Sequence, residues 1–253
     1  MIDIAAAAER LDNAALNAAA IEQFGDSLGL DEAYRVQHAL IARRLARGER
    51  RIGLKMGFTS RAKMAQMGVG DLIWGKLTDA MLVDDGGEIA LSSFVHPRVE
   101  PELAFLIGRR LAGRISMLDV QAAVAGVAPA MEIIDSRYRD FHFSLADVVA
   151  DNTSGAALVV GAWRSANVDV ANLGMVMSID GVAVQIGSTA AILGHPFRAL
   201  VAAARLAGEA GEALEPGDIV LAGAATAAEP LRCGVHVMLE AQNLGQAAFS
   251  VAA

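Results

Sequence analysis

Short apolar runs separated by glycine, aspartate and proline make up most of this chain after residue 51. Such runs, bounded by turn-forming residues, are typical of strands. A type I′ hairpin is predicted where Asp180-Gly181 joins two of them. Many short strands indicate a mostly β core and not repeated βαβ units. We expect strands at Ile52–Met56, Ala80–Val83, Leu103–Ile107, Met131–Ile134, Ala156–Val160, Met175–Ile179, Ile219–Leu221 and Val235–Leu239.

Helical periodicity dominates the N-terminal part of the chain. Residues 4–48 predict an alanine-rich helix over about 4–23 and a second helix that begins at Asp31, whose side chain can cap it. The change of pattern near residue 50 divides the chain into an N-terminal helical region (residues 1–50) packed on a β domain (residues 51–253). Two later helices are expected, at Leu118–Val127 and Pro196–Ala210.

Composition narrows the classes of protein. The chain has 253 residues, 54% of them hydrophobic, which is enough for a large core. Its net charge of −8 argues against nucleic acid as a partner, because phosphate binding needs concentrated positive charge. Neither a signal peptide nor a membrane-spanning apolar stretch is expected. One cysteine, Cys233, fits a reducing cytoplasm, and the apolar content favours a homo-oligomer.

Two glutamates, Glu100 and Glu102, lie one residue apart in an apolar segment. Alternate residues of a strand share a face at a spacing of about 6.5–7 Å, so both carboxylates are expected to point the same way. Buried carboxylates repel each other unless a cation or a shared proton lies between them. With Glu132, a third carboxylate among apolar residues, they suggest an oxygen-ligand site for Mg²⁺ or Mn²⁺. Ion pairs with Arg98 or Arg137 are the other interpretation.

Three further polar positions interrupt segments that otherwise look buried. Lys55 lies within the first expected strand. A buried lysine suits proton transfer or anion binding. The alternative is that the Lys55 side chain extends to the surface and keeps its ammonium group in water. Asp79 precedes another apolar run and is either a turn residue or an acid–base partner. Residues 151–155 either cap a turn or present donors to an anion. Together with the carboxylates, these positions suggest a metal site for an oxyanionic substrate.

Several common catalytic motifs are absent from the sequence. It contains no Gly-x-Gly-x-x-Gly, no phosphate loop ending in Gly-Lys-Ser/Thr, no His-Glu-x-x-His and no Gly-x-Ser-x-Gly. The five histidines are scattered and form no zinc pattern. His195 directly precedes Pro196 and is interpreted as a turn or helix-start residue, not as a catalytic base.

A series of short segments resembles the fumarylacetoacetate hydrolase superfamily, in the branch of 2-keto-4-pentenoate hydratases and 4-oxalocrotonate decarboxylases. The segments occur in the family's order and span about residues 30–245. The resemblance implies an α+β fold with a mixed β-roll core, peripheral helices and an N-terminal helical region. The segments are Gly53–Ser60, Lys63–Val69, Gly75–Asp79, His96–Glu102, Glu132–Tyr138, Asp147–Ser154, Leu193–Pro196 and Pro216–Gly223.

The resemblance also implies which residues form the site. Glu100, Glu102 and Glu132 match the family's three carboxylate ligands of Mg²⁺ or Mn²⁺, with water and substrate oxygens completing the coordination. Lys55 and Asp79 match positions near the reacting carbons and are the expected proton-transfer pair. The matching segments also contain the candidates for substrate binding, which are Thr59, Ser60, Arg137, Asn152 and Ser154.

Within this branch, the sequence favours decarboxylation of a 2-oxo-enedioate. Residues 55–69 and 136–143 look more like the decarboxylase subgroup than like the hydratases. The expected reaction converts 4-oxalocrotonate (2-oxohex-3-enedioate) to 2-hydroxypenta-2,4-dienoate in the meta-cleavage catabolism of aromatic compounds. A cation that chelates the 2-oxo acid lets developing negative charge delocalise into a metal-bound enolate.

The distal carboxylate of such a dioate requires a cation or hydrogen-bond donors. Arg137, Arg139 and His142 lie in the stretch where the family would place them. For Arg137, an ion pair with Asp135 or Asp151 is an equally good interpretation.

Other functions remain open at this point. Residues 75–82 resemble a hydratase, so hydration of 2-hydroxypenta-2,4-dienoate is the main alternative. C–C hydrolysis of an acylpyruvate and a non-catalytic scaffold subunit are lesser ones. The expected ligand is a small 2-oxo acid substrate. Family decarboxylases and hydratases are described as forming complexes with one another, so a complex with the partner enzyme of the same pathway is also expected. A scaffold, however, has no need for three buried carboxylates.

Overall fold

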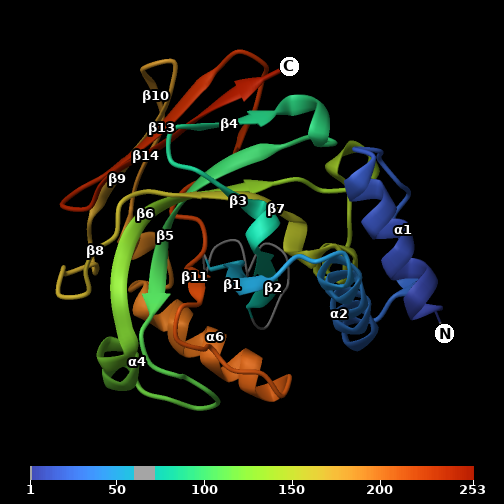
Figure 1. Cartoon of the computed structure of the whole chain (residues 1–253), viewed down its shortest axis with the longest axis horizontal. Helices are drawn as coiled ribbons and strands as arrows, with labels where there is room; N and C mark the ends of the chain where they lie inside the picture. Colours follow the sequence, from blue (N-terminus) through green and yellow to red (C-terminus); the bar gives the residue numbers. More distant parts are fainter. Residues whose placement is uncertain (1, 60–71) are drawn as a thin grey trace.

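The computed structural model describes residues 2–59 and 72–253, and two β-sheets form its centre (Figure 1). The larger sheet contains β1 (Arg51–Gly57), β2 (Ile73–Thr78), β3 (Leu82–Val83), β5 (Arg98–Ile107), β6 (Val124–Ile134), β7 (Gly155–Val160), β8 (Arg164–Ser165), β11 (Ile219–Leu221) and β12 (Glu229–Pro230). The smaller sheet contains β4 (Gly87–Ala90), β9 (Gly174–Ile179), β10 (Val182–Ser188), β13 (His236–Ala241) and β14 (Gly245–Ala252).

Both sheets mix parallel and antiparallel pairs. The larger sheet has the order β2-β1-β11-β5-β6-β7-β3, with β12 paired to β5 and β8 to β6, and the smaller one has the order β10-β9-β13-β14-β4. The pairs β1–β11, β3–β7 and β4–β14 are parallel, whereas β5 and β6 form a long antiparallel pair. Figure 1 shows β5 and β6 curving through the middle of the molecule, with the smaller sheet beside them. The mixed α+β fold expected from the sequence is confirmed.

The helices lie around these sheets and not between successive strands of a βαβ pattern. They are α1 (Ile4–Leu16), α2 (Leu30–Ala46), α4 (Met117–Ala123), α5 (Leu145–Ala150) and α6 (Phe197–Glu209). In Figure 1, α4 and α6 lie at one end of the curled sheet, and α1 and α2 lie together at its side. The ring of Phe197 in α6 packs 5.5 Å from that of Phe105 in β5, which joins this helix to the main core.

Several local predictions can be compared with the structure. The hairpin at Asp180-Gly181 is confirmed, because both residues have positive φ (52° and 78°) and join β9 to β10. The helix predicted over Leu118–Val127 is wrong in its second half, since α4 ends at Ala123 and Val124 begins β6. The β-branched residues at this end pair with β5 and pack into the sheet, and tertiary pairing therefore overrides the helical pattern.

The N-terminal helices are anchored by contacts with later parts of the chain. An apolar cluster combines residues of α1 and α2 with Ile73, Tyr138 and Val149. The buried Gln37 side chain in α2 donates to the carbonyls of Trp74 (2.9 Å) and Val149 (3.0 Å). The helical region therefore shares its core with β2 and α5, and the division of the chain at residue 50 stays a prediction.

A buried ion cluster ties α1 to α2. Asp12 is 1% exposed and accepts hydrogen bonds from Arg47 (2.6 and 2.8 Å) and Arg43 (2.9 Å). Burial alone would raise the pKa of Asp12, but hydrogen bonds and charges from Arg47 and Arg43 outweigh it and lower the pKa.

Replacing Asp12 with asparagine is expected to lower the free energy of unfolding by about 1–3 kcal/mol, the range for hydrogen bonds to charged groups. Because the folded pKa is lowered, the wild-type contribution is present above the unfolded value of about 3.9 and is lost as the pH falls through the folded value. Urea unfolding of both proteins between pH 3 and 7 measures this difference. Equal stability at pH 7 would contradict it.

Within residues 2–59 and 72–253, no helix has both the length and the apolar character needed to cross a bilayer.

Candidate metal centre

Three carboxylates converge on the inner face of the larger sheet. Alternation along β5 sends Val99, Leu103 and Phe105 into the main core and leaves Glu100 and Glu102 on the opposite face. Glu132 in β6 stands directly opposite Glu100 in the antiparallel register. One oxygen from each of the three glutamates lies within 4.8 Å of the others, so they can share one cation.

The hydrogen bonds of these carboxylates fit a metal site. Glu102 and Glu132 are fully buried, and Glu102 Oε2 accepts a hydrogen bond from the backbone N–H of Gly223 at 2.7 Å. Glu102 Oε1 and Glu132 Oε2 have no hydrogen-bond partner within the described ranges. Buried acceptors are rarely left without a partner, so these oxygens suit coordination by Mg²⁺ or Mn²⁺.

The electrostatics of the cluster lead to the same conclusion. Burial raises the pKa of Glu102 well above its usual value, and the charges of Glu132 and Glu100 raise it further. Burial likewise raises the pKa of Glu132 to about 7, against the opposing charge of Lys55. A divalent cation reverses this balance, because it favours the charged form of each carboxylate.

Lys55 is a buried part of the same cluster and does not reach the surface. It lies on β1, is 2% exposed, and places Nζ 2.5 Å from Glu132 Oε1. The same ammonium group donates to the carbonyl of Thr153 at 2.8 Å. Gly155 makes room for this contact, since a Cβ there would lie 3.1 Å from Lys55 Cδ. The structure therefore fixes a positive charge and its protons beside the carboxylates.

A left-handed turn between α5 and β7 shapes this side of the site. Asn152, Thr153 and Ser154 have φ values of 50°, 52° and 58°, which are unusual for residues other than glycine. Asn152 holds the turn, because its amide accepts from Lys76 N (2.8 Å) and donates to Lys76 O (2.9 Å). Ser154 Oγ is buried without a hydrogen-bond partner in the described part of the chain. It can donate to a substrate oxygen.

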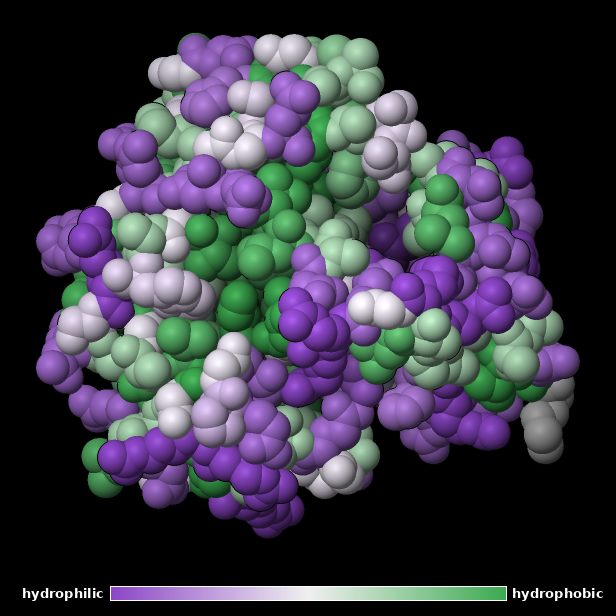
Figure 2. Space-filling model, viewed as in Figure 1, coloured by the Kyte–Doolittle hydropathy of each residue, from purple (hydrophilic) through white to green (hydrophobic). Residues whose placement is uncertain are grey.

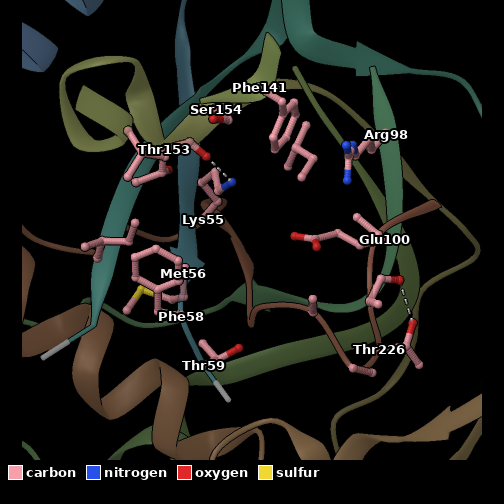
Figure 3. A pocket seen from close by; sticks show the side chains of 18 of the residues that line it. Lys55, Met56, Phe58, Thr59, Arg98, Glu100, Phe141, Thr153, Ser154 and Thr226 are labelled. Atoms are coloured by element: carbon pink, nitrogen blue, oxygen red, sulfur yellow. Dashed lines mark hydrogen bonds between the residues drawn. The ribbon is translucent and has the colours of Figure 1, made fainter. Parts of the chain in front are cut away.

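Of these groups, Lys55, Glu100, Thr153 and Ser154 line a cavity of about 700 Å³. Figure 3 shows Lys55, Ser154 and Glu100 around its open centre, with Arg98 and Phe141 on the side opposite Thr59. Much of the remaining wall is apolar, and it includes Phe58, Ile73, Ile134, Phe143, Val148 and Ala225. The cavity thus combines one carboxylate, Glu100, and two cations, Lys55 and Arg98, with an apolar wall, and small-molecule sites commonly have this composition.

Of the predicted substrate-binding residues, the structure brings Thr59 and Ser154 to the cavity. Ser60 lies outside the described residues. Asn152 is not among the lining residues, and its amide is used in the hydrogen bonds with Lys76. Arg137 is also placed elsewhere, because its guanidinium and backbone bind the buried Asp151 (Nε to Oδ1, 2.5 Å). The alternative interpretation of Arg137 as half of an ion pair is the one that the structure supports.

Asp79 is not brought to Lys55. Thr78, its neighbour, pairs with Arg51 at one end of β1, whereas Lys55 lies four residues further along that strand. Asp79 instead accepts hydrogen bonds from Arg50 N (2.8 Å) and Arg50 Nε (2.9 Å), which lower its pKa. The expected proton-transfer pair therefore needs correction, because Glu132 and not Asp79 is the carboxylate beside Lys55.

Arg98 and Phe141 line the cavity but were not among the predicted site residues. His142, one of the three groups considered for the distal carboxylate, also lines it. For Arg98 the sequence carries a signal, since it precedes Glu100 by two residues on the same strand and so shares its face. His195 lies in the turn just before α6, in agreement with its interpretation as a turn or helix-start residue. Its Nδ1 accepts from Phe197 N at 3.2 Å, and burial lowers its pKa.

Comparison with known proteins shows the family of this chain. The family described as fumarylacetoacetate (FAA) hydrolase, C-terminal, matches residues 56–252. The chain belongs to the fumarylacetoacetate hydrolase family. Among its curated relatives, a 4-oxalocrotonate decarboxylase of Pseudomonas sp. is 62% identical over 245 residues, covering 96% of each chain. A 2-keto-4-pentenoate hydratase of Paraburkholderia xenovorans, a more distant relative, is 36% identical over 78% of this chain and 74% of its own.

Solved structures also resemble this chain. The 4-oxalocrotonate decarboxylase of Pseudomonas putida G7, complexed with magnesium and adipate, matches with a TM-score of 0.95 and 38% identity, over 98% of this chain and 97% of that one. A fumarylpyruvate hydrolase of Pseudomonas aeruginosa matches at 18% identity with a TM-score of 0.65, which shows a shared fold. The assignment of the chain to the fumarylacetoacetate hydrolase superfamily, made from the sequence segments, is confirmed.

Gly223 offers a test of how the site is supported. Its φ is +99°, and a Cβ at this position would lie 2.1 Å from Thr59 Oγ1. Replacing Gly223 with alanine is expected to displace Thr59 and the backbone N–H of residue 223, which donates a hydrogen bond to Glu102. The free energy of unfolding should fall by at least about 1 kcal/mol. Thermal unfolding and magnesium titration of the variant measure both effects. Wild-type values in both would show that this close contact is not needed.

Proposed function

We propose that this protein is a metal-dependent decarboxylase of 2-oxo-enedioates, acting on 4-oxalocrotonate (2-oxohex-3-enedioate) to give 2-hydroxypenta-2,4-dienoate. One observation carries the proposal. Three carboxylates can share one cation, and two of them, Glu102 and Glu132, have buried oxygens without a hydrogen-bond partner in the described ranges. The third, Glu100, lines the cavity together with Lys55 and Ser154. The resemblance to 4-oxalocrotonate decarboxylases over nearly the whole chain supports this choice of reaction.

The residues that would hold the cation are Glu100, Glu102 and Glu132, and Mg²⁺ fits their hard oxygen atoms. When bound, such a cation supplies Lewis-acid stabilisation of the negative charge that decarboxylation leaves on the 2-oxo group. The chain's own residues position the substrate around it. The Ser154 hydroxyl lines the cavity and is free to donate a hydrogen bond to the substrate.

Lys55 is the group best placed to move the proton. Its ammonium is held by Glu132 and by the Thr153 carbonyl, at the edge of the cavity. As the C5–C6 bond breaks, its electron pair moves through the conjugated chain to the C2 oxygen, and CO₂ leaves. Lys55 can then donate a proton from Nζ to the product, with Glu132 fixing the direction of the ammonium group.

The test compares two substrates in parallel. Purified protein with Mg²⁺ is expected to release CO₂ from 2-oxohex-3-enedioate with a kcat/KM far above that for hydration of 2-hydroxypenta-2,4-dienoate. Hydration without CO₂ release would make the protein a hydratase and overturn the choice of reaction. Inactivity with both compounds would contradict the substrate class.

Assembly is a separate part of the proposal. We infer a cytoplasmic homo-oligomer, which can also bind the hydratase that consumes its product. Large apolar side chains stay exposed on this chain, among them Leu118, Val182 and Ile186, and Figure 2 shows apolar surface gathered in the middle of one face. Light scattering of the purified protein is expected to give a multiple of its 26.3 kDa chain mass. A monomer would contradict this inference.

A further inference from the structure

Arg98 is a cavity-lining guanidinium that makes no ion pair within the described residues. It lies two residues before Glu100 on β5, on the same face of the strand, and it contributes to the wall of the cavity. Its guanidinium carbon is 4.2 Å from the centre of the Phe141 ring. No anionic side chain of the described residues pairs with this guanidinium, so its N–H groups on the cavity side are available to a ligand.

The Phe141 ring is a fixed support for this guanidinium. Its centre lies 5.4 Å from that of Phe143 and 5.7 Å from that of His96, whose Nε2 is 2.8 Å from the Tyr138 carbonyl oxygen. A guanidinium stacked on an aromatic face keeps the N–H groups of its edge free for hydrogen bonds. Figure 3 shows the side chains of Arg98 and Glu100 directed into the same open space.

Charge explains why a second cation is needed there. The three glutamates, Lys55 and a divalent cation together carry no net charge. A 2-oxo-enedioate brings two negative charges, and only the carboxylate next to the 2-oxo group can share the metal with it. Arg98 supplies the additional positive charge that the distal carboxylate lacks.

The spacing also matches the substrate. The Cα atoms of residues two apart on a strand are about 6.5–7 Å apart. This separation is similar to the distance between the 2-oxo end and the distal carboxylate of an extended six-carbon chain. The planar fork of an arginine binds a carboxylate through two parallel hydrogen bonds. Of the three groups expected in this role, Arg137 binds Asp151 and Arg139 binds Glu22, so both are engaged outside the cavity. His142 also lines the cavity, but an imidazole lacks the fork of parallel donors that an arginine presents.

We propose that Arg98 binds the distal carboxylate of the substrate and makes the enzyme select dicarboxylates over monocarboxylates, an inference that rests on the proposed function. The chemistry gives this role a kinetic signature. The distal carboxylate loses its charge as the C5–C6 bond breaks and CO₂ forms, so its attraction to Arg98 weakens in the transition state. Arg98 therefore contributes to substrate binding and not to the chemical step.

The experiment compares Arg98→Met with Arg98→Lys and with the matched control Arg139→Met, which removes an arginine that is 60% exposed and lies outside the cavity. For CO₂ release from 2-oxohex-3-enedioate, Arg98→Met is expected to raise KM about 10- to 100-fold, as for the loss of a charged hydrogen-bonded pair, with kcat unchanged or raised because the lost interaction weakens in the transition state. Arg98→Lys should recover part of this loss, and Arg139→Met should match the wild type. A fall in kcat at unchanged KM in Arg98→Met would overturn the inference.

Equilibrium binding keeps this test independent of activity. Calorimetry of the Mg²⁺-loaded protein compares adipate, a six-carbon dicarboxylate, with hexanoate, its monocarboxylate counterpart. Wild type is expected to bind adipate at least tenfold more tightly, and Arg98→Met is expected to lose this preference without losing affinity for hexanoate. A preference that persists in Arg98→Met, or that is absent from the wild type, would overturn the role of Arg98. Lack of CO₂ release by a wild type that prefers adipate would instead contradict the proposed reaction.

Discussion

Replacing Glu102 with glutamine is expected to abolish Mg²⁺-dependent CO₂ release while leaving the protein folded. Glu102 is fully buried, accepts from Gly223 N, and has a second oxygen with no partner in the described segments. The amide keeps the shape of the side chain but loses the charge that a divalent cation requires. Loss of a Lewis acid that contributes several kcal/mol to the transition state corresponds to a fall in kcat of at least about 10³-fold.

The expected stability effect of the same change has the opposite sign. In the metal-free protein, glutamine removes a buried carboxylate that faces two others, so the melting temperature should stay the same or rise. Glu215→Gln is the matched control, because Glu215 is an exposed carboxylate paired with Arg110, and this variant should keep full activity. Wild-type kcat and magnesium affinity in Glu102→Gln would remove Glu102 from the ligand set.

Replacing Lys55 with methionine is the second change with a large expected effect. Methionine fills a similar volume but carries neither the proton nor the charge that lies beside Glu132 and the Thr153 carbonyl. General acid–base groups contribute roughly 10²- to 10⁴-fold, so kcat is expected to fall by that factor while magnesium affinity changes much less. Steady-state kinetics and magnesium titration of the purified variant measure the two quantities.

A second substitution at this position distinguishes a role of Lys55 in proton transfer from a role of its positive charge alone. Lys55→Arg keeps the positive charge, but an arginine does not give up its proton at neutral pH. If Lys55 moves the proton, kcat should remain low in this variant as well. A rise in KM alone, in either variant, would show that Lys55 anchors the substrate and that the proton comes from another group.

Two of the three carboxylates of the candidate metal site could be predicted to lie together from the sequence, because their placement depends on local strand geometry. Strand periodicity alone placed Glu100 and Glu102 on one face, and the structure has them there. The position of Glu132 opposite Glu100 depends on the register of β5 and β6, which the sequence pattern does not specify. Resemblance to the family supplied that link.

The errors arose where position along a strand or competition between partners decides the outcome. Asp79 looked suitable by residue type, but it lies at the far end of β1 and β2 from Lys55, next to Arg50. Arg137 lies in the expected segment, yet the buried Asp151 satisfies it. Arg98 was considered only as an ion-pair partner of the glutamates, although its period-two spacing from Glu100 places it at the cavity.

The helices and strands also divide into those that local sequence predicts and those that it does not. Turn chemistry predicted the hairpin at Asp180-Gly181 correctly, because positive φ at both positions is a property of those two residues. By contrast, β2 and β14 were not predicted, although β14 pairs with β13 along most of its length. β2 pairs with β1, and β14 pairs both with the neighbouring β13 and with the distant β4, so tertiary context contributes to both strands.

The most direct test of the account is CO₂ release by protein that has been freed of metal with EDTA and then titrated with Mg²⁺. With 2-oxohex-3-enedioate as substrate, we expect no CO₂ above the uncatalysed rate before addition, and release that rises to saturation as the glutamate site fills. CO₂ release at the full rate by the metal-free protein would contradict the central claim that Glu100, Glu102 and Glu132 hold the cation on which the reaction depends.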